Sequence, residues 1–260
     1  MKRILSFSLF AALAFVGNAA FADHTCTKIV ATGHPQYPAI AYKDGDNIAG
    51  AAPMLVEAIA KNLKIPLESK YMGTWADAQA AARDGKADMI FGIYYNDERA
   101  TYLDYVKPAF MFDEVVIFIA KGKGFPFKGE NDLIGKKGVT NQGESYGNDF
   151  DAFIKDKLTV ARTDGIDAAF KDLLAGKADY LIAGYYSGLA EAAKAGVKDQ
   201  VEPLSPAILE AEMFVAFSKK SPCRSLAPGF SHGITEMTTN GSFDTMLQDA
   251  TSAWEAAQKH

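Results

Sequence analysis

The sequence predicts an α/β fold built of two lobes. Apolar runs of strand length alternate with amphipathic stretches of helix length, a pattern typical of sheets covered by helices. A short motif that begins with glycine occurs once in each half of the chain. Two strongly apolar strands are each followed by lysines, and they are the expected crossings between the lobes.

The first half has ordinary start and stop signals for its elements. Pro53 stands at a favourable first-turn position of a helix, and apolar residues then recur at helical spacing. Thr74 and Asp77 have the spacing of a capping box at the start of a second helix, which is expected to stop at Gly85. The expected strands of this half lie at residues 28–32, 67–71 and 89–91.

A repeated motif links the two halves. Residues 85–95 and 176–186 both consist of Gly-Lys-Ala-Asp, an apolar strand and a Tyr-Tyr pair, with an expected helix ahead of each. Ligands of open α/β sheets lie beyond the carboxyl ends of the strands. We therefore expect Tyr94 and Tyr185 to face a shared cleft. The alternative is that these tyrosines are ordinary core or surface packing residues.

The chain is expected to cross between the lobes along two apolar strands, residues 114–120 and 211–218. The first lobe would then comprise residues 23–117 together with residues 216–260. The second lobe would comprise residues 118–215.

Residues 1–22 are expected to be a cleaved signal peptide. Lys2 and Arg3 precede an almost unbroken apolar stretch, and residues 20–22 form the small-x-small pattern of a signal-peptidase site. A membrane anchor is the alternative, but the stretch is short against roughly 30 Å of hydrocarbon. We therefore expect export to the periplasm and a mature chain that starts at Asp23.

Cys26 and Cys223 are the two cysteines of the sequence. An even count in an oxidising compartment suggests one disulfide, which would join the start of the mature chain to a segment near its end in the same lobe. Two unpaired thiols are the alternative. Two cysteines alone do not make a closed zinc site, and the sequence suggests no metal and no cofactor.

Charge excludes one class of partner. The formal net charge is −5, and the lysines are interspersed with acids rather than gathered into a basic stripe. Nucleic-acid-binding proteins carry such stripes, so nucleic acid is not expected as a partner. No feature marks an oligomer interface, and we expect a monomer.

Motifs spread over the mature chain resemble those of the family 3 extracellular solute-binding proteins, the amino-acid-binding partners of ABC importers. The motifs are Tyr37-Pro38, Trp75, residues 85–88, residues 97–99, residues 134–139 and Gln142-Gly143. Their order and spacing carry the resemblance. It implies a periplasmic-binding-protein-like fold of type II, in which a two-strand hinge joins two lobes and a ligand cleft lies between them.

The resemblance also implies a set of ligand contacts. Arg99 matches the arginine that grips a ligand carboxylate, for which a guanidinium is well shaped; the alternative is a surface salt bridge with an adjacent acid. Tyr37 matches a stacking aromatic residue. Residues 143–146 lie at an expected helix start, where N–H groups favour an anion, although Ser145 could be a simple N-cap. The full set is Tyr37, Trp75, Gly92, Tyr94, Asn96, Arg99, Gly143, Glu144, Ser145, Tyr146 and Tyr185.

Two acids common in amino-acid binders of this family are missing. The position five residues after Asp179 is Gly184, and Gly33 and His34 fill the loop after the first strand. A buried ammonium without an anionic partner is costly, which argues against a standard α-amino acid in the usual pose. An amino acid held differently, or a related carboxylate with an apolar or aromatic body, is the expected small-molecule ligand.

Three function classes are compatible with these features. The leading one is a periplasmic binding protein that delivers its ligand to an inner-membrane ABC permease and performs no chemistry. The second is an accessory or sensor binding protein. The third is an enzyme similar to the periplasmic dehydratases of this fold, for which His34, Glu144 and Tyr146 are the candidate acids and bases.

Overall fold

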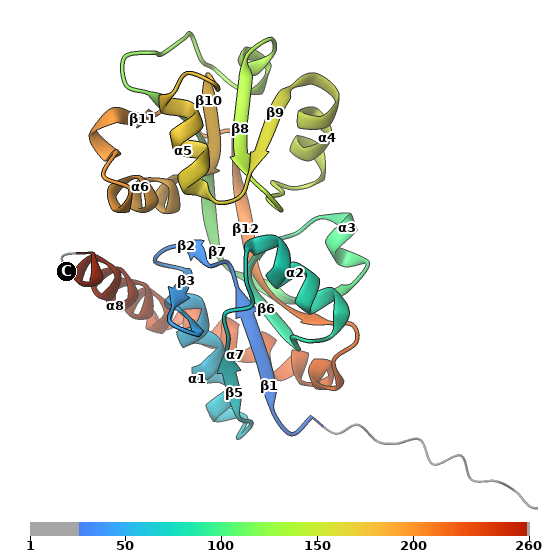
Figure 1. Ribbon diagram of the computed structural model, residues 1–260. Helices are drawn as coiled ribbons and strands as arrows, with labels where there is room; N and C mark the ends of the chain where they lie inside the picture. Colours follow the sequence, from blue (N-terminus) through green and yellow to red (C-terminus); the bar gives the residue numbers. More distant parts are fainter. Residues whose placement is uncertain (1–25, 259–260) are drawn as a thin grey trace, which may run out of the picture.

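The computed structural model describes residues 26–258 (Figure 1). Over this range one mixed sheet of nine strands runs through the molecule in the order β5-β1-β6-β12-β7-β10-β8-β9, with β11 paired to β7. A separate three-stranded sheet has the order β2-β3-β4. Figure 1 shows the elements gathered into two lobes, one above the other. The predicted two-lobed α/β fold is confirmed.

The first lobe, at the bottom of Figure 1, joins the N-terminal half of the chain to its C-terminal helices. Its strands are β1 (Ile29–Gly33), β2 (Gln36–Tyr37), β3 (Ala41–Asp44), β4 (Asn47–Ala49), β5 (Leu67–Ser69) and β6 (Met89–Tyr94). Its helical segments are α1 (Ala51–Asn62), α2 (Trp75–Asp84), α3 (Asp97–Ala100), the 3-10 turn η3 (Pro222–Leu226), α7 (Ala227–Thr239) and α8 (Ser242–Ala257). Strand β1 pairs in parallel with β5 and β6, and α1 packs against α7 and α8. Buried Leu55, Ile59 and Phe230 belong to the core of this lobe.

The second lobe is formed by the middle of the chain. Its elements are η1 (Glu130–Leu133), β8 (Lys137–Asn141), α4 (Asn148–Lys157), β9 (Thr159–Thr163), α5 (Ile166–Leu174), β10 (Tyr180–Gly184), α6 (Tyr185–Lys194), η2 (Lys198–Gln200) and β11 (Val201–Pro203). Strand β8 lies between β9 and β10 and is parallel to both. Phe118 and Phe170 meet edge to face at 6.1 Å in the core of this lobe.

Two long antiparallel strands carry the chain between the lobes, β7 (Leu103–Ala120) and β12 (Leu209–Ser218). Strand β12 pairs with β6 and β7, whereas the far end of β7 pairs with β10 and β11. Figure 1 shows both strands running from one lobe into the other. The boundaries at residues 117 and 216 stay a prediction.

Local sequence signals explain how the helices of the first lobe begin. The side chain of Thr74 accepts the N–H of Asp77 and the Asp77 side chain accepts the N–H of Thr74, so the predicted capping box is formed. Helix α2 ends at Gly85, whose φ of 79° suits glycine. Helix α1 begins at Ala51, two residues before the predicted start at Pro53, because Pro53 occupies its first turn. The strand predicted at residues 67–71 ends at Ser69.

The repeated Gly-Lys-Ala-Asp motif has the same backbone role in each lobe. Gly85 and Gly176 both follow a helix and adopt positive φ. Asp88 accepts the N–H of Val30 at 2.9 Å, and Asp179 accepts the N–H of Lys137 at 2.7 Å. Each aspartate thus joins the strand of its own motif to the neighbouring parallel strand. The repeat is explained by equivalent sheet contacts in two lobes.

The predicted disulfide between Cys26 and Cys223 is present. It ties the chain just before β1 to η3 in the first lobe, and Cys223 is buried. The bridge closes a loop with a sequence separation of 197 residues. On the chain-entropy model such a loop stabilises the fold by about 4–5 kcal/mol.

The predicted signal peptide, residues 1–22, lies outside the described residues. Among residues 26–258 no helix has the length and apolar character needed to span a bilayer.

Candidate functional site

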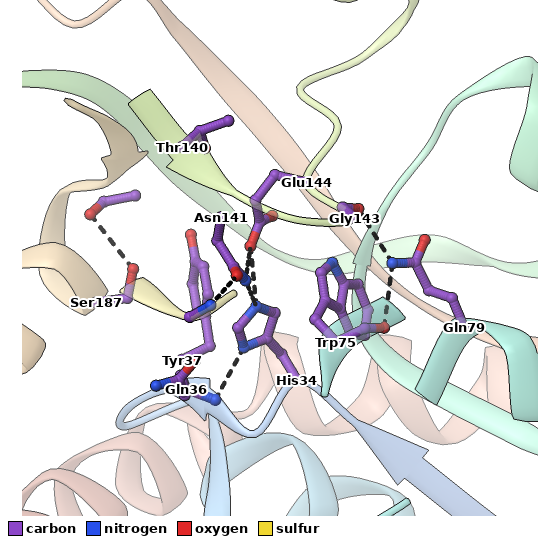
Figure 2. Close-up of polar contacts among 12 residues, drawn as sticks. His34, Gln36, Tyr37, Trp75, Gln79, Thr140, Asn141, Gly143, Glu144 and Ser187 are labelled. Carbon is purple, nitrogen blue, oxygen red and sulfur yellow. Dashed lines mark hydrogen bonds and ion pairs between the residues drawn. The ribbon is translucent and has the colours of Figure 1, made fainter. Parts of the chain in front are cut away.

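The two lobes meet at a direct contact between His34 and Glu144. His34 follows β1, Glu144 lies in the loop after β8, and His34 Nε2 is 2.9 Å from Glu144 Oε1. The His34 side chain is buried, and the Glu144 side chain is 13% exposed. Figure 2 shows the His34 ring between Tyr37 and Trp75, with Glu144 and Asn141 above it. The contact joins the first lobe to the second across the space where a ligand cleft was predicted.

Neighbouring groups set the protonation of this pair. The N–H of Gln36 donates to His34 Nδ1 at 2.9 Å, so the imidazole carries its proton on Nε2 and donates it to Glu144. Burial alone would raise the pKa of Glu144. Contact with His34 and the positive charge of Arg99 outweigh burial and hold that pKa below its ordinary value. Glu144 is therefore a carboxylate at neutral pH.

Arg99 lies in α3 and is only 2% exposed. Its Nε donates to Gln79 Oε1, its Nη1 to the carbonyl of Tyr94 and its Nη2 to the carbonyl of Gly143, each at 3.0 Å. Gln79 also donates to the Gly143 carbonyl, at 3.1 Å. Because Gly143 belongs to the second lobe, Arg99 connects the two lobes here. That Arg99 binds a ligand carboxylate stays a prediction.

Asn96 and Ser145 form a third contact between the lobes. Asn96 Nδ2 donates to Ser145 Oγ at 2.6 Å, while Asn96 Oδ1 accepts the N–H of Arg99 as the cap of α3. The helix start predicted at residues 143–146 is wrong, since α4 begins at Asn148. Ser145 does not cap that helix; its hydroxyl donates to Asp151 instead, and Gly147 takes the N-cap position.

Asp113 of β7 anchors a buried cluster of phenols. The hydroxyls of Tyr37 and Tyr94 both donate to Asp113 Oδ2 and lie 2.6 Å from each other. Burial raises the pKa of Asp113, and the two hydrogen bonds offset only part of this effect. Burial and the Asp113 charge also raise the pKa of Tyr37 well above its ordinary value. Both phenols are therefore neutral donors to a carboxylate.

Gly184 leaves room for this cluster. A Cβ atom at Gly184 would stand 1.9 Å from the Tyr37 hydroxyl and 2.6 Å from Asp113 Oδ2. The place of a side chain at position 184 is thus taken by groups from the first lobe and from β7. The absence of an aspartate at this position has a steric explanation.

The other predicted site residues have separate places. Trp75 is buried, its ring is 4.8 Å from that of His34, and its Nε1 has no hydrogen-bond partner among residues 26–258. Tyr146 is buried and its hydroxyl donates to the carbonyl of Ile182 at 2.9 Å. Gly92 has a φ of 70° and is the extra residue at a bulge of β6 against β12. Tyr185 packs against the core of the second lobe.

Around the contact between His34 and Glu144, side chains fill most of the space between the lobes. The cavity that remains at this place has a volume of about 10 Å³, which is room for roughly one water molecule. Its lining includes His34, Tyr37, Tyr94, Asn141, Glu144, Tyr146 and Gly184. A larger molecule enters this space only if the lobes separate or the side chains move.

Sequence reasoning missed Asp113 and Gln79. Asp113 and Glu114 are adjacent acids in an apolar strand, where alternation turns one side chain to each face; that signal pointed to one inward acid. Gln79 lies one helical turn after Trp75 and carried no comparable signal. Among residues 26–258 no group of three His, Cys, Asp or Glu side chains is arranged to hold a metal ion.

Comparison with known proteins gives a family and a fold. Residues 29–250 match the model of the bacterial extracellular solute-binding proteins, family 3. The substrate-binding protein AbpA of an amino acid ABC transporter from Streptococcus pneumoniae, bound to L-arginine, is similar with a TM-score of 0.71 and 22% identity, covering 88% of this chain and 96% of that one. No match was found among the curated proteins.

Two further solved structures have the same fold. The arginine-, lysine- and histidine-binding protein ArtJ from Geobacillus stearothermophilus gives a TM-score of 0.70 at 19% identity, covering 86% of this chain and 95% of that one. A histidine kinase sensor domain similar to periplasmic binding proteins gives 0.72 at 22% identity, covering 85% and 95%. At these identities the likeness shows the fold.

Proposed function

We infer that this chain, which belongs to the bacterial extracellular solute-binding proteins of family 3, captures a small solute between its lobes and delivers it to an ABC importer. The observation that carries the proposal is the set of contacts between the lobes at one place, where His34, Arg99 and Asn96 each contact the second lobe. The amino acid ABC transporter protein AbpA supports the importer as partner by its likeness.

The proposed mechanism is hinge closure. Strands β7 and β12 connect the lobes, and a solute bound to groups of both lobes shifts the balance from an open to a closed arrangement. In the open form, Arg99 releases the carbonyl of Gly143 and its guanidinium receives the carboxylate of the solute. Two parallel hydrogen bonds to a carboxylate are stronger than one to a neutral carbonyl, so the solute competes for this arginine.

The proposed solute contacts combine residues of both lobes. Tyr37, Tyr94, Asn96 and Arg99 come from the first lobe, and Glu144, Ser145 and Tyr146 come from the second. Trp75 supplies an aromatic wall beside His34. A small molecule with a carboxylate, an amino acid among them, fits these groups.

We propose that the protein binds its solute without chemistry. Both nitrogens of His34 are engaged, since Nδ1 accepts from Gln36 and Nε2 contacts Glu144. A general acid or base must reach a reacting atom of its substrate. The proposal also includes export through cleavage of residues 1–22 and action as a monomer in the periplasm.

The test is a thermal-shift screen of the mature chain after unfolding and refolding to remove carried-over solute. The panel contains amino acids, the matching acids without the amino group, aromatic acids and phosphates. A solute at a hundred times its Kd stabilises the fold by roughly 2.7 kcal/mol, which is visible as a raised Tm.

Two variants make the screen specific. Arg99→Ala should abolish the shift, whereas Arg224→Ala should leave it unchanged, because Arg224 is exposed and contacts Asp104 away from the cleft. A panel without any shift, or a shift that survives Arg99→Ala, contradicts the proposal. Retained solute with turnover to a product would favour an enzyme.

A further inference from the structure

A second, larger cavity lies beside the cleft, between α6 and α8. Its volume is about 700 Å³, within the range of small-molecule sites. The two helices are close here: Lys194 Nζ of α6 lies 5.5 Å from the ring centre of Trp254 in α8. Figure 1 shows α6 in the upper lobe and α8 in the lower lobe on the same side of the hinge strands. The apolar walls include Ile40, Met111, Leu189, Ala193, Leu247 and Trp254.

Asp113 is the buried charged residue of this cavity. It is 3% exposed, and its Oδ2 receives the hydroxyls of Tyr37 and Tyr94. No group among residues 26–258 donates a hydrogen bond to its Oδ1. A carboxylate in apolar surroundings is stabilised by a cation placed against its unpaired oxygen.

The charged residues at the rim do not provide that cation. Lys198 and Glu255 also line the cavity, but both are exposed and their charges are opposite. Asp113 is therefore the buried charge of a mostly apolar cavity, whose lining also includes the uncharged polar residues Ser187, Thr251 and Gln258.

We propose that this cavity binds a small amphiphilic amine, with its ammonium on Asp113 Oδ1 and its apolar body between α6 and α8. The chemical class follows from the two features together: a hydrocarbon or aromatic body for the walls and one positive group for the buried acid. A free carboxylate on the ligand would be repelled by Asp113. The cavity does not include Arg99, the residue proposed to receive the carboxylate of the solute.

The position of the cavity couples it to closure. Its walls come from both lobes, and Tyr37 lines both this cavity and the cleft. An amine that contacts α6 and α8 together therefore favours the arrangement in which the lobes are close.

The test uses isothermal titration of the refolded mature chain with phenethylamine. The control compounds are 3-phenylpropionate and 3-phenylpropanol, which keep the aromatic body and replace the ammonium by an anion or a neutral group. Saturable binding of the amine, and weaker binding of both controls, is the expected result.

Variants locate the binding. Asp113→Asn should weaken phenethylamine binding about tenfold or more, the effect of losing a charged partner. Glu114→Gln removes the same charge from the next residue of β7, which is exposed, and should leave binding unchanged. Ala193→Trp fills the cavity from its wall and should abolish binding, and this keeps the test decisive if Asp113→Asn does not fold. Arg224→Ala should bind the amine like the wild type, because Arg224 is exposed and contacts Asp104 away from the cavity.

The inference is overturned if phenethylamine does not bind saturably at millimolar concentration or if either control compound binds as tightly. Wild-type affinity in Asp113→Asn or in Ala193→Trp would equally overturn it. None of these outcomes affects the carboxylate screen with Arg99→Ala, so the two proposals fail separately.

Discussion

His34 and Glu144 lie 2.9 Å apart across the two lobes, and each is fixed by a second contact. Gln36 donates to the far nitrogen of His34, and Asn141 donates to the same oxygen of Glu144 at 3.3 Å. Because these second contacts already restrict the rotamers of His34 and Glu144, little side-chain entropy is lost when the two residues meet. The relationship makes the closed arrangement of the lobes sensitive to single substitutions.

Glu144→Gln should loosen the loop that carries it. The substitution replaces a charged acceptor of His34 by a neutral one, and hydrogen bonds to charged groups contribute about 1.5–3 kcal/mol. We expect faster hydrogen exchange over residues 142–147, measured by mass spectrometry. Glu98→Gln, at an exposed acid, serves as the control, and equal exchange in both variants would refute the contribution of this pair.

The same carboxylate predicts an acid dependence of stability. Because the pKa of Glu144 is below its ordinary value in the folded protein, its ionised form stabilises the fold above the unfolded pKa of about 4.3. This stabilisation is lost as the pH falls through the lower folded pKa. The Tm difference between the wild type and Glu144→Gln should therefore shrink between neutral pH and strong acid. A Tm difference that stays constant over this pH range would contradict a stabilising role of the Glu144 carboxylate.

The contribution of Asp113 to stability should depend on pH in the opposite direction. Burial raises its folded pKa, so its contribution to stability is most favourable below the unfolded pKa and is lost as the pH rises through the folded value. Asp113→Asn should therefore gain stability relative to the wild type as the pH is raised toward neutrality. Urea unfolding at several pH values measures this trend, and a gain confined to acid would contradict it.

Gly184→Ala tests the close packing against Tyr37. The new Cβ would lie 1.9 Å from the Tyr37 hydroxyl, and overpacking of this kind costs about 1–3 kcal/mol. Tyr37→Phe in the same chain removes the hydroxyl and should recover part of the loss, a coupling read from a double-mutant cycle of unfolding free energies. Gly129→Ala is the control, because its Cβ meets no atom within 4 Å. Strict additivity of the two substitutions would be the contrary result.

Replacing both Cys26 and Cys223 by Ser should lower the free energy of unfolding by about 2–5 kcal/mol. The loss follows from releasing a loop with a sequence separation of 197 residues. Calorimetry of the wild type with and without reductant provides the comparison. Reductant should lower the Tm of the wild type and leave that of the double variant unchanged.

The features that could be predicted from the sequence are those that depend on residues close together along the chain or on the number of cysteines. The capping box of Thr74 and Asp77, the repeated Gly-Lys-Ala-Asp motif and the pairing of two cysteines each depend on local chemistry or on simple counting. The start of α4 was missed because Gly147, rather than Ser145, takes the cap position once Ser145 donates to Asp151.

Contacts between distant segments could not be predicted in this way. The bond from Arg99 to the Gly143 carbonyl exists only when two lobes pack, and no spacing along the chain encodes it. Asp113 meets Tyr37 and Tyr94 because β2, β6 and β7 converge. The motif around Arg99 suggested a role in binding a carboxylate, whereas the protein's own carbonyl occupies that arginine in the structure.

Small-angle X-ray scattering measures whether the lobes close around a solute. The refolded chain is measured with and without the strongest solute from the screen, in the wild type and in Arg99→Ala. We predict a smaller radius of gyration for the wild type with solute and no change for Arg99→Ala. An unchanged radius of gyration in the wild type, with binding verified by titration in the same sample, would show that the solute binds without closure of the lobes.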